Sequence, residues 1–191
     1  KTIIIAEAGV NHNGDITLAK KLIDAASRAN ADYVKFQTFK SEHLVDSKAL
    51  KARYQKINTN NSIETQFQML KKLELTHENH IELIDYCKLK NIKFLSSAFD
   101  LESLDYLNKL DLDYFKIPSG EITNYPFLDK ISSFNKSVIL STGMSNIDDI
   151  GNAINVLTKK NIIISEVTVL HCNTDYPTLH KDVNLKAMCY I

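Results

Sequence analysis

Two lysines stand inside otherwise apolar runs of this sequence. Lys35 lies in YVKFQT (33–38), and Lys116 lies in YFKIPSGE (114–121). Burying an ammonium group without a partner is costly, so each lysine is expected to face either an anionic ligand or a protein carboxylate. Glu7 and Glu121 are the candidate carboxylates. We favour the ligand and keep the ion pair as the alternative.

Serine hydroxyls accompany these lysines. Ser97, Ser119 and Ser141 could donate hydrogen bonds, and the turns at Gly120 and Gly143 let backbone amides approach an anion. Such groups suit a small substrate that carries phosphate or carboxylate. The sequence has no GxxxxGK[ST] motif, and no GxGxxG follows its first apolar run. A P-loop nucleotide site and a Rossmann dinucleotide site are therefore not favoured.

Other reactive side chains have two interpretations each. Glu7 and Glu121 could each transfer a proton or orient a sugar hydroxyl, or could only pair with a lysine. His77 and His80 have a spacing that could hold a metal, but we favour two solvated histidines at a helix start. Cys172 could be a nucleophile, and we favour a small buried strand residue.

The elements that must position these residues form a regular pattern. Six apolar runs end in polar residues, and helical patterns separate most of them. The runs are 3–9, 33–38, 93–99, 114–121, 138–143 and 167–173. Strands that are almost continuously apolar are typical of a parallel sheet covered on both faces. The C-terminal strand ends then meet on one face, where α/β barrels carry their active sites.

Local signals mark several helices. Asp15 and Thr76 are expected N-caps, and Ser145 with Asp148 resembles a capping box. After Asp15, the predicted helix has an apolar stripe that consists of Leu18, Leu22, Ala25, Ala26 and Ala29. The stretch 39–75 is too long for an ordinary strand–helix connection. It is expected to hold a helical piece at 64–72 and to serve either as a lid or as a variable excursion. DVNLKAM (182–188) is expected to begin another helix.

The composition narrows the function classes. The chain has 191 residues, which suits one domain spanning 1–191, and its 23 basic residues balance 23 acidic ones. This balance gives no support for a nucleic-acid surface or a membrane patch. No apolar run approaches a membrane helix in length, and no secretory signal is visible. With three sparse cysteines, these features lead us to expect reduced thiols and a cytoplasmic protein.

Six sequence blocks carry a family resemblance. They are AEAGVNHNGD, VKFQTF, FLSSAFD, FKIPSGEITNYP, ILSTGM and LHCNTDYP, and they occur in this order along essentially the whole chain. Together they resemble the N-terminal catalytic domain of the sialic acid (N-acetylneuraminate) synthases, including the legionaminic and pseudaminic acid synthases. The resemblance implies a (β/α)8 TIM barrel, here truncated after about six βα units. The family's C-terminal antifreeze-like domain is expected to lie outside residues 1–191.

The resemblance also implies a reaction. Phosphoenolpyruvate condenses with N-acetylmannosamine or a related N-acetylated hexosamine, which gives a nine-carbon sialic acid and phosphate. A divalent metal, Mn²⁺ or Mg²⁺, polarises the sugar aldehyde in the full-length protein. The full-length protein is expected to be a homodimer.

By resemblance, five residues bind phosphoenolpyruvate. Lys35 and Ser141 are expected to bind its phosphate, and Lys116, Ser119 and Ser97 its carboxylate.

Five further residues are placed near the water or the sugar. Glu121 resembles the catalytic residue that handles the attacking water. Glu7, also expected to be catalytic, and Gln37 resemble residues near the aldehyde and the metal. Tyr176 resembles a sugar contact. Thr174 stands where some members have a phosphate-binding asparagine.

The family's metal-binding histidines lie in SDHT-like and HF-like motifs, which this sequence lacks. The metal ligands are therefore expected beyond Ile191, and residues 1–191 alone are expected to be inactive and prone to aggregate. Two alternatives remain. One is a Schiff-base aldolase with Lys116 as the nucleophile. The other is an inactive fragment that only binds an anionic ligand or a partner.

Overall fold

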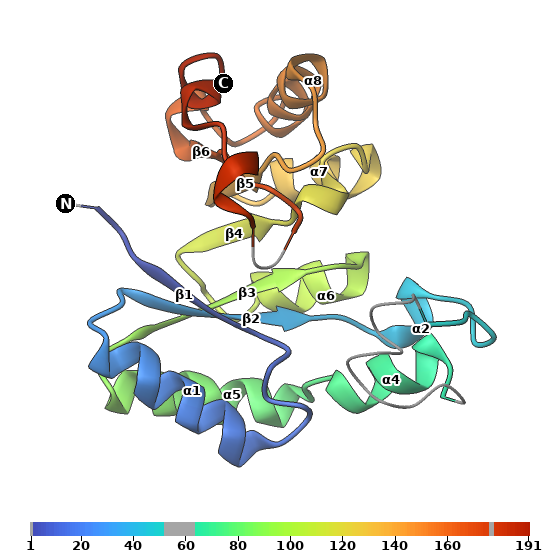
Figure 1. The fold of residues 1–191 in the computed structure, drawn as a ribbon, viewed down its shortest axis with the longest axis vertical. Coiled ribbons are helices and arrows are strands. Elements are labelled where there is room, and N and C mark those ends of the chain that lie inside the picture. The colour runs from blue at the N-terminus through green and yellow to red at the C-terminus, as the bar shows by residue number, and fades with distance from the viewer. Residues whose placement is uncertain (1, 52–63, 176–177) are drawn as a thin grey trace. The chain divides into compact units, whose positions relative to one another are not determined.

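The computed structural model describes residues 2–51, 64–175 and 178–191. The chain forms two compact units, Lys1–Ser103 and Leu104–Ile191 (Figure 1). Each unit is built on three parallel strands that follow one another in chain order.

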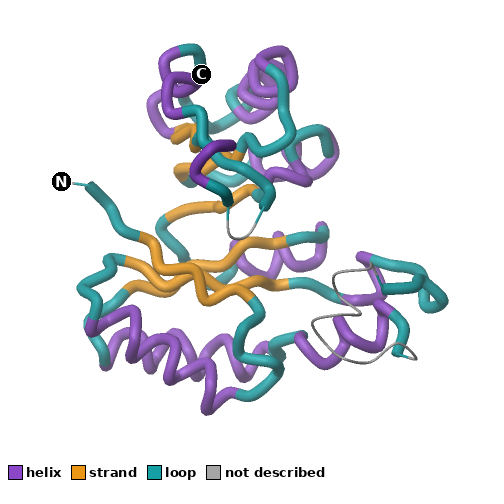
Figure 2. Tube along the Cα trace, viewed as in Figure 1, coloured by secondary structure: helices purple, strands orange, loops and turns teal. Residues whose placement is uncertain are grey.

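The first unit alternates strands and helices. Its elements are β1 (Ile5–Gly9), α1 (Ile16–Arg28), β2 (Tyr33–Thr38), α2 (Ser41–Leu44), α4 (Gln66–Leu73), α5 (His77–Leu89), β3 (Lys93–Ala98) and the start of α6 (Leu101–Asn108). Helices α1 and α5 lie side by side against one face of the three strands (Figures 1 and 2). The predicted strand at 33–38 has the observed bounds, and the helical piece predicted at 64–72 is confirmed as α4.

Side-chain caps fix where the two long helices begin. The Asp15 carboxylate accepts hydrogen bonds from the backbone amides of Thr17 and Leu18, and the Thr76 hydroxyl accepts one from Asn79. Both predicted N-caps are therefore confirmed. Of the residues in the predicted apolar stripe of α1, only Ala26 is buried, and the other buried positions of the helix are Ala19 and Ile23.

The two faces of the strands in this unit differ in chemistry. Lys35 and Gln37 lie on the face away from α5, since side chains alternate along a strand. The other face carries Phe36, whose ring stacks on Phe94 at 5.5 Å between centroids. His80 of α5 meets the edge of Phe94. An aromatic layer thus fills the space between the sheet and α5.

The second unit continues the same alternation. Its elements are β4 (Tyr114–Ile117), a 3-10 turn η1 (Ser119–Glu121), α7 (Tyr125–Ser132), β5 (Ser137–Ser141), α8 (Ile147–Leu157), η2 (Ile164–Glu166), β6 (Val167–Leu170), η3 (His180–Asp182) and η4 (Leu185–Cys189). Helices α7 and α8 pack against each other (Figure 1). The helix expected from DVNLKAM is wrong, because the segment forms only short 3-10 turns.

The start of α8 differs from the prediction by one residue. The capping box joins Asn146 to Asp149 and not Ser145 to Asp148. Met144 has a left-handed φ of 61°, and the Ser145 hydroxyl donates to the Gly143 carbonyl. Ser145 therefore belongs to the turn after β5. Across all described helices, none is long and apolar enough to cross a membrane.

Candidate functional site

Lys35 is the charged centre of a polar cluster at the strand ends of the first unit. It is only 8% exposed, and its Nζ lies 2.7 Å from Glu7 Oε2 and 3.4 Å from Ser97 Oγ. The ion pair that the sequence left as an alternative is therefore present. The Glu7 side chain is 47% exposed. The pair is thus accessible to solvent on the Glu7 side, where an anion could share the ammonium.

A bulge in β1 makes room for this cluster. Glu7 lies opposite Lys35 in the β1–β2 register, which then shifts so that Gly9 lies opposite Phe36. Gly9 has a φ of 53°, and a Cβ there would lie 3.2 Å from Glu7 Oε1 and 3.7 Å from Gln37 Nε2. Glycine suits this position for both reasons. Gln37 in turn faces Ser97 in the β2–β3 register.

The second unit has its own lysine and serine at the strand ends. Lys116 Nζ donates to Ser141 Oγ at 2.6 Å and to the Ile117 carbonyl at 2.9 Å. Lys116 is half-buried and Ser141 is buried. The strand end thus presents an ammonium beside a hydroxyl, a pair that can bind an anion.

Ser119 is oriented by the turn after β5. The Gly143 amide donates to Ser119 Oγ at 2.9 Å, so the Ser119 hydroxyl hydrogen is available to donate to another acceptor. A Cβ at Gly143 would lie 2.8 Å from the Thr174 methyl group and 3.0 Å from Ser119 Oγ. The absence of a side chain at Gly143 is what allows this close approach.

Glu121 lies two residues after Ser119 and is only partly buried. Its Oε2 accepts a hydrogen bond of 2.7 Å from Asn124 Nδ2. Asn124 also caps α7 through its side-chain oxygen, which accepts from the Phe127 amide. The carboxylate is therefore tied through Oε2 to the start of a helix.

The predicted residues fall into two groups by unit. The first unit holds Glu7, Lys35, Gln37 and Ser97, and the second holds Lys116, Ser119, Glu121, Ser141 and Thr174. Tyr176 lies outside the described residues.

The possible metal ligands and two of the thiols can be located in the described parts of the chain. Within residues 2–51, 64–175 and 178–191, no group of three His, Cys, Asp or Glu side chains could hold a metal ion. Cys172 is half-buried, and its thiol donates to the Leu170 carbonyl. Burial raises the pKa of the Cys87 thiol to about 12, which keeps it protonated.

The expectation of two solvated histidines at the start of α5 is wrong for His80. The ring is fully buried, with Nε2 2.8 Å from Thr38 Oγ1 and Nδ1 2.8 Å from the Thr76 carbonyl oxygen. His77 remains exposed. The signal available in the sequence was Thr38, a polar residue at a helix-facing position of a buried strand, which requires a partner.

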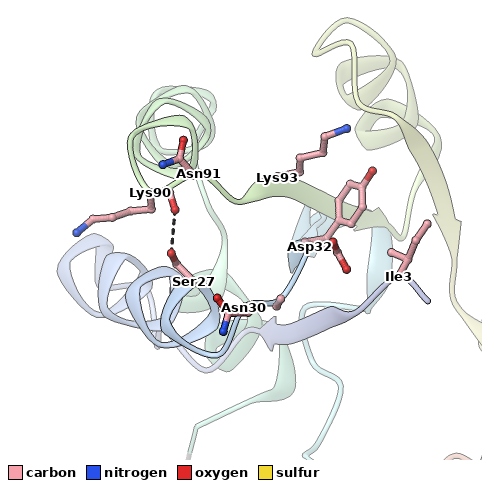
Figure 3. A pocket seen from close by; sticks show the side chains of 9 residues that line it. Ile3, Ser27, Asn30, Asp32, Lys90, Asn91 and Lys93 are labelled. Atoms are coloured by element: carbon pink, nitrogen blue, oxygen red, sulfur yellow. Dashed lines mark hydrogen bonds between the residues drawn. The ribbon is translucent and has the colours of Figure 1, made fainter. Parts of the chain in front are cut away.

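A hollow of about 680 Å³ lies elsewhere in the first unit, at the N-terminal ends of β2 and β3 (Figure 3). Ser27, Asp32, Lys90 and Lys93 are among its lining residues. The Ser27 hydroxyl donates to the Lys90 carbonyl, Asp32 accepts from the Ile4 amide, and Lys90 pairs with Asp24. These side chains hold neighbouring segments together, and the candidate residues lie at the opposite strand ends.

Comparison with known proteins identifies relatives over nearly the whole chain. The chain is 57% identical over 188 residues to an N,N'-diacetyllegionaminic acid synthase of Campylobacter jejuni, covering 98% of this chain and 56% of that protein. It is 47% identical to the protein of the same name from Legionella pneumophila, covering 97% of this chain and 52% of that protein. The chain thus spans about half the length of these curated relatives.

A solved structure supports the fold. The N-acetylneuraminic acid synthetase of Leptospira borgpetersenii, solved with citrate, is 30% identical and superposes with a TM-score of 0.82, covering 99% of this chain and 61% of that one. The predicted (β/α)8 barrel, truncated after about six βα units, is thereby confirmed. Residues 22–191 match the model of the NeuB family. The chain therefore belongs to the NeuB family.

Proposed function

We propose that residues 1–191 are the N-terminal catalytic part of an enzyme that condenses phosphoenolpyruvate with an acetamido sugar to give a nine-carbon acid and phosphate. A new bond joins C3 of phosphoenolpyruvate to the aldehyde carbon. Water adds at C2, and the C2–O bond to phosphate breaks. The observation that carries this proposal is that each strand lysine contacts a serine hydroxyl at a strand end, Lys35 with Ser97 and Lys116 with Ser141.

We further propose N,N'-diacetyllegionaminic acid as the product, because two relatives at 57% and 47% identity carry that name. The carbon balance then defines the second substrate. Removing the three carbons of phosphoenolpyruvate from a nine-carbon acid leaves a six-carbon aldehyde sugar with two acetamido groups. N-acetylmannosamine, which has one such group, is the alternative substrate.

Lys35 and Ser141 are proposed to bind the phosphate, and Lys116, Ser119 and Ser97 the carboxylate. Charge-assisted hydrogen bonds from an ammonium to such oxygens are stronger than neutral ones. In its contact with the Gly143 amide, Ser119 Oγ is the acceptor, so this contact does not use the hydroxyl hydrogen, which we propose donates to the carboxylate. These contacts hold and orient phosphoenolpyruvate before the carbon–carbon bond forms.

Glu121 is proposed to orient the attacking water and accept its proton. The Asn124 amide, which donates to Oε2, fixes the carboxylate in place. Glu7 and Gln37 are proposed to lie near the aldehyde, and Thr174 and Tyr176 near the substrates. A bound Mn²⁺ or Mg²⁺ would polarise the aldehyde oxygen. Because the sequence lacks the family's SDHT-like and HF-like motifs, we propose that the metal ligands lie beyond Ile191, in a homodimeric cytoplasmic enzyme.

The test uses the purified full-length protein with Mn²⁺, phosphoenolpyruvate and each sugar in turn. Phosphate release should depend on the sugar, and mass spectrometry should detect the nine-carbon acid. The diacetamido sugar should give a higher kcat/KM than N-acetylmannosamine. Absence of phosphate release with both sugars would contradict the proposed reaction, and a preference for N-acetylmannosamine would contradict only the product.

A borohydride control distinguishes the proposed synthase from the alternative Schiff-base aldolase. In the structure, Lys116 Nζ donates to two oxygen atoms, whereas a Schiff-base nucleophile presents a lone pair to a carbonyl carbon. Enzyme that is treated with borohydride in the presence of substrate and then freed of the reagent is therefore expected to keep its activity and to carry no adduct on Lys116. A trapped adduct would favour the aldolase.

A further inference from the structure

We propose that His80 is a positioning residue for Gln37 and Ser97, acting through the side chains of Thr38 and Ser96. This inference rests on the proposed function, in which Gln37 and Ser97 contact the substrates. His80 itself lies on α5, in the layer between helix and sheet.

The connection is a continuous chain of short contacts, named here the His80 network. His80 Nδ1 lies 2.8 Å from the Thr76 carbonyl oxygen, and His80 Nε2 lies 2.8 Å from Thr38 Oγ1. Thr38 Oγ1 in turn lies 2.7 Å from Ser96 Oγ. His80 is fully buried, and Thr38 and Ser96 are buried as well. The network thus joins the start of α5 to the ends of β2 and β3.

The direction of each hydrogen bond follows from the first contact. A carbonyl oxygen only accepts, so His80 Nδ1 carries the hydrogen that Thr76 receives. Burial lowers the pKa of His80, so the ring is neutral near pH 7 and Nε2 is an acceptor. The Thr38 hydroxyl must then donate to Nε2, and Thr38 Oγ1 accepts from the Ser96 hydroxyl. One proton arrangement is therefore favoured throughout the network.

The network acts on the strand residues next to those proposed to contact substrate. Thr38 directly follows Gln37, and Ser96 directly precedes Ser97. Gln37 and Ser97 lie opposite each other in the β2–β3 register. Because consecutive side chains point to opposite faces, the network lies on the helix-facing side of the two strand ends, and Gln37 and Ser97 lie on the other side. A shift of the backbone at Thr38 or Ser96 would therefore displace Gln37 or Ser97.

The apolar surroundings of the His80 network limit the positions of its hydroxyl groups more than packing alone would. Phe36 and Phe94 form the apolar layer beside it, and Phe94 meets the His80 ring at 73°. A buried polar group without a partner is unfavourable in such a layer. Each hydroxyl therefore has few alternative positions, and so does the strand end that carries it.

Three variants of the full-length enzyme test the inference. Ser96→Ala removes the last donor, His80→Phe removes the acceptor for Thr38, and His80→Gln offers an amide oxygen in its place. Ser27→Ala is the matched control. Its hydroxyl also ties α1 to a loop of the same unit, by donating to the Lys90 carbonyl at 2.8 Å, but at the opposite strand ends (Figure 3).

Steady-state KM and kcat are measured beside thermal stability. Ser96→Ala and His80→Phe are expected to raise the KM for phosphoenolpyruvate about tenfold, because a displaced Ser97 would weaken its proposed hydrogen bond to the substrate carboxylate. His80→Gln should restore KM to within about threefold of wild type, and Ser27→Ala should lower stability without changing KM.

Two results would overturn the inference. One is an unchanged KM in Ser96→Ala, with loss of stability alone. The other is His80→Gln behaving like His80→Phe, since a network that needs an acceptor should accept the amide. If the wild-type enzyme releases no phosphate, that result contradicts the proposed function and therefore this inference as well. An active wild type with unchanged variants would remove the inference alone.

Discussion

Replacing Gly143 by alanine should weaken substrate binding more than it weakens the fold. The new Cβ would lie 2.8 Å from the Thr174 methyl carbon and 3.0 Å from Ser119 Oγ. Carbon atoms in contact prefer about 3.5 Å or more, so the methyl group must retreat by roughly 0.7 Å. Thr174 is exposed and can move outward. Overpacking should therefore cost near the lower end of its usual range, about 1 kcal/mol.

At Ser119, Gly143→Ala should weaken the proposed binding of the phosphoenolpyruvate carboxylate. Displacing Oγ lengthens its 2.9 Å hydrogen bond from the Gly143 amide and turns the hydroxyl that is proposed to bind the carboxylate. A hydrogen bond to a charged group contributes about 1.5–3 kcal/mol, so the KM for phosphoenolpyruvate should rise at least about tenfold. The assays are steady-state kinetics and urea unfolding of the full-length enzyme.

Two companion variants sharpen this test. A Cβ at Gly151 in α8 meets nothing within 4 Å, so Gly151→Ala should raise helix stability by up to about 1 kcal/mol and leave KM unchanged. Adding Thr174→Ser to Gly143→Ala removes the methyl clash, which should restore stability but not KM. A KM within about twofold of wild type in Gly143→Ala would refute the reasoning.

Three further predictions concern charge. Lys116→Ala should raise the KM for phosphoenolpyruvate at least about tenfold, because the ammonium that donates to Ser141 is lost, and an unchanged KM would contradict its anion role. Glu7→Gln removes a negative charge 2.7 Å from Lys35, so the KM for phosphoenolpyruvate should fall. If Glu7 transfers a proton, kcat should also drop by about 100-fold or more. Glu82→Gln, which removes the carboxylate of the exposed Lys20 pair, is the control. Burial lowers the pKa of His80 from 6.5 to about 4, so the unfolded chain binds a proton that the folded chain does not. Stability should therefore fall by about 3 kcal/mol as pH drops from about 6.5 to 4. His80→Gln should flatten this dependence in urea titrations, and an unchanged slope would contradict the assignment.

The strand ends could be predicted from the sequence because their signal is local. A parallel strand buried on both faces reads as an apolar run, so Lys35 and Lys116 stand out within it. The N-caps Asp15 and Thr76 were equally local, since a cap bonds to amides two or three residues away. The pairing of Lys35 with Glu7 could only be offered as an alternative, because it depends on the β1–β2 register and the bulge before Gly9.

Some contacts could not be predicted from the sequence because the partners lie on different helices and strands. His80 follows a cap and a polar first turn, and no neighbour in sequence distinguishes it from the exposed His77. His80 becomes buried when α5 packs on β2 and β3. This packing brings it to Thr38, 42 residues earlier in the chain, and Thr38 contacts Ser96, 16 residues after His80. A buried hydroxyl on the helix-facing side of a strand usually has a hydrogen-bond partner. If Gln37 and Ser97 contact the substrates as proposed, the opposite, helix-facing side of each strand also shapes the site, because the contacts of Thr38 and Ser96 limit where these neighbours can lie.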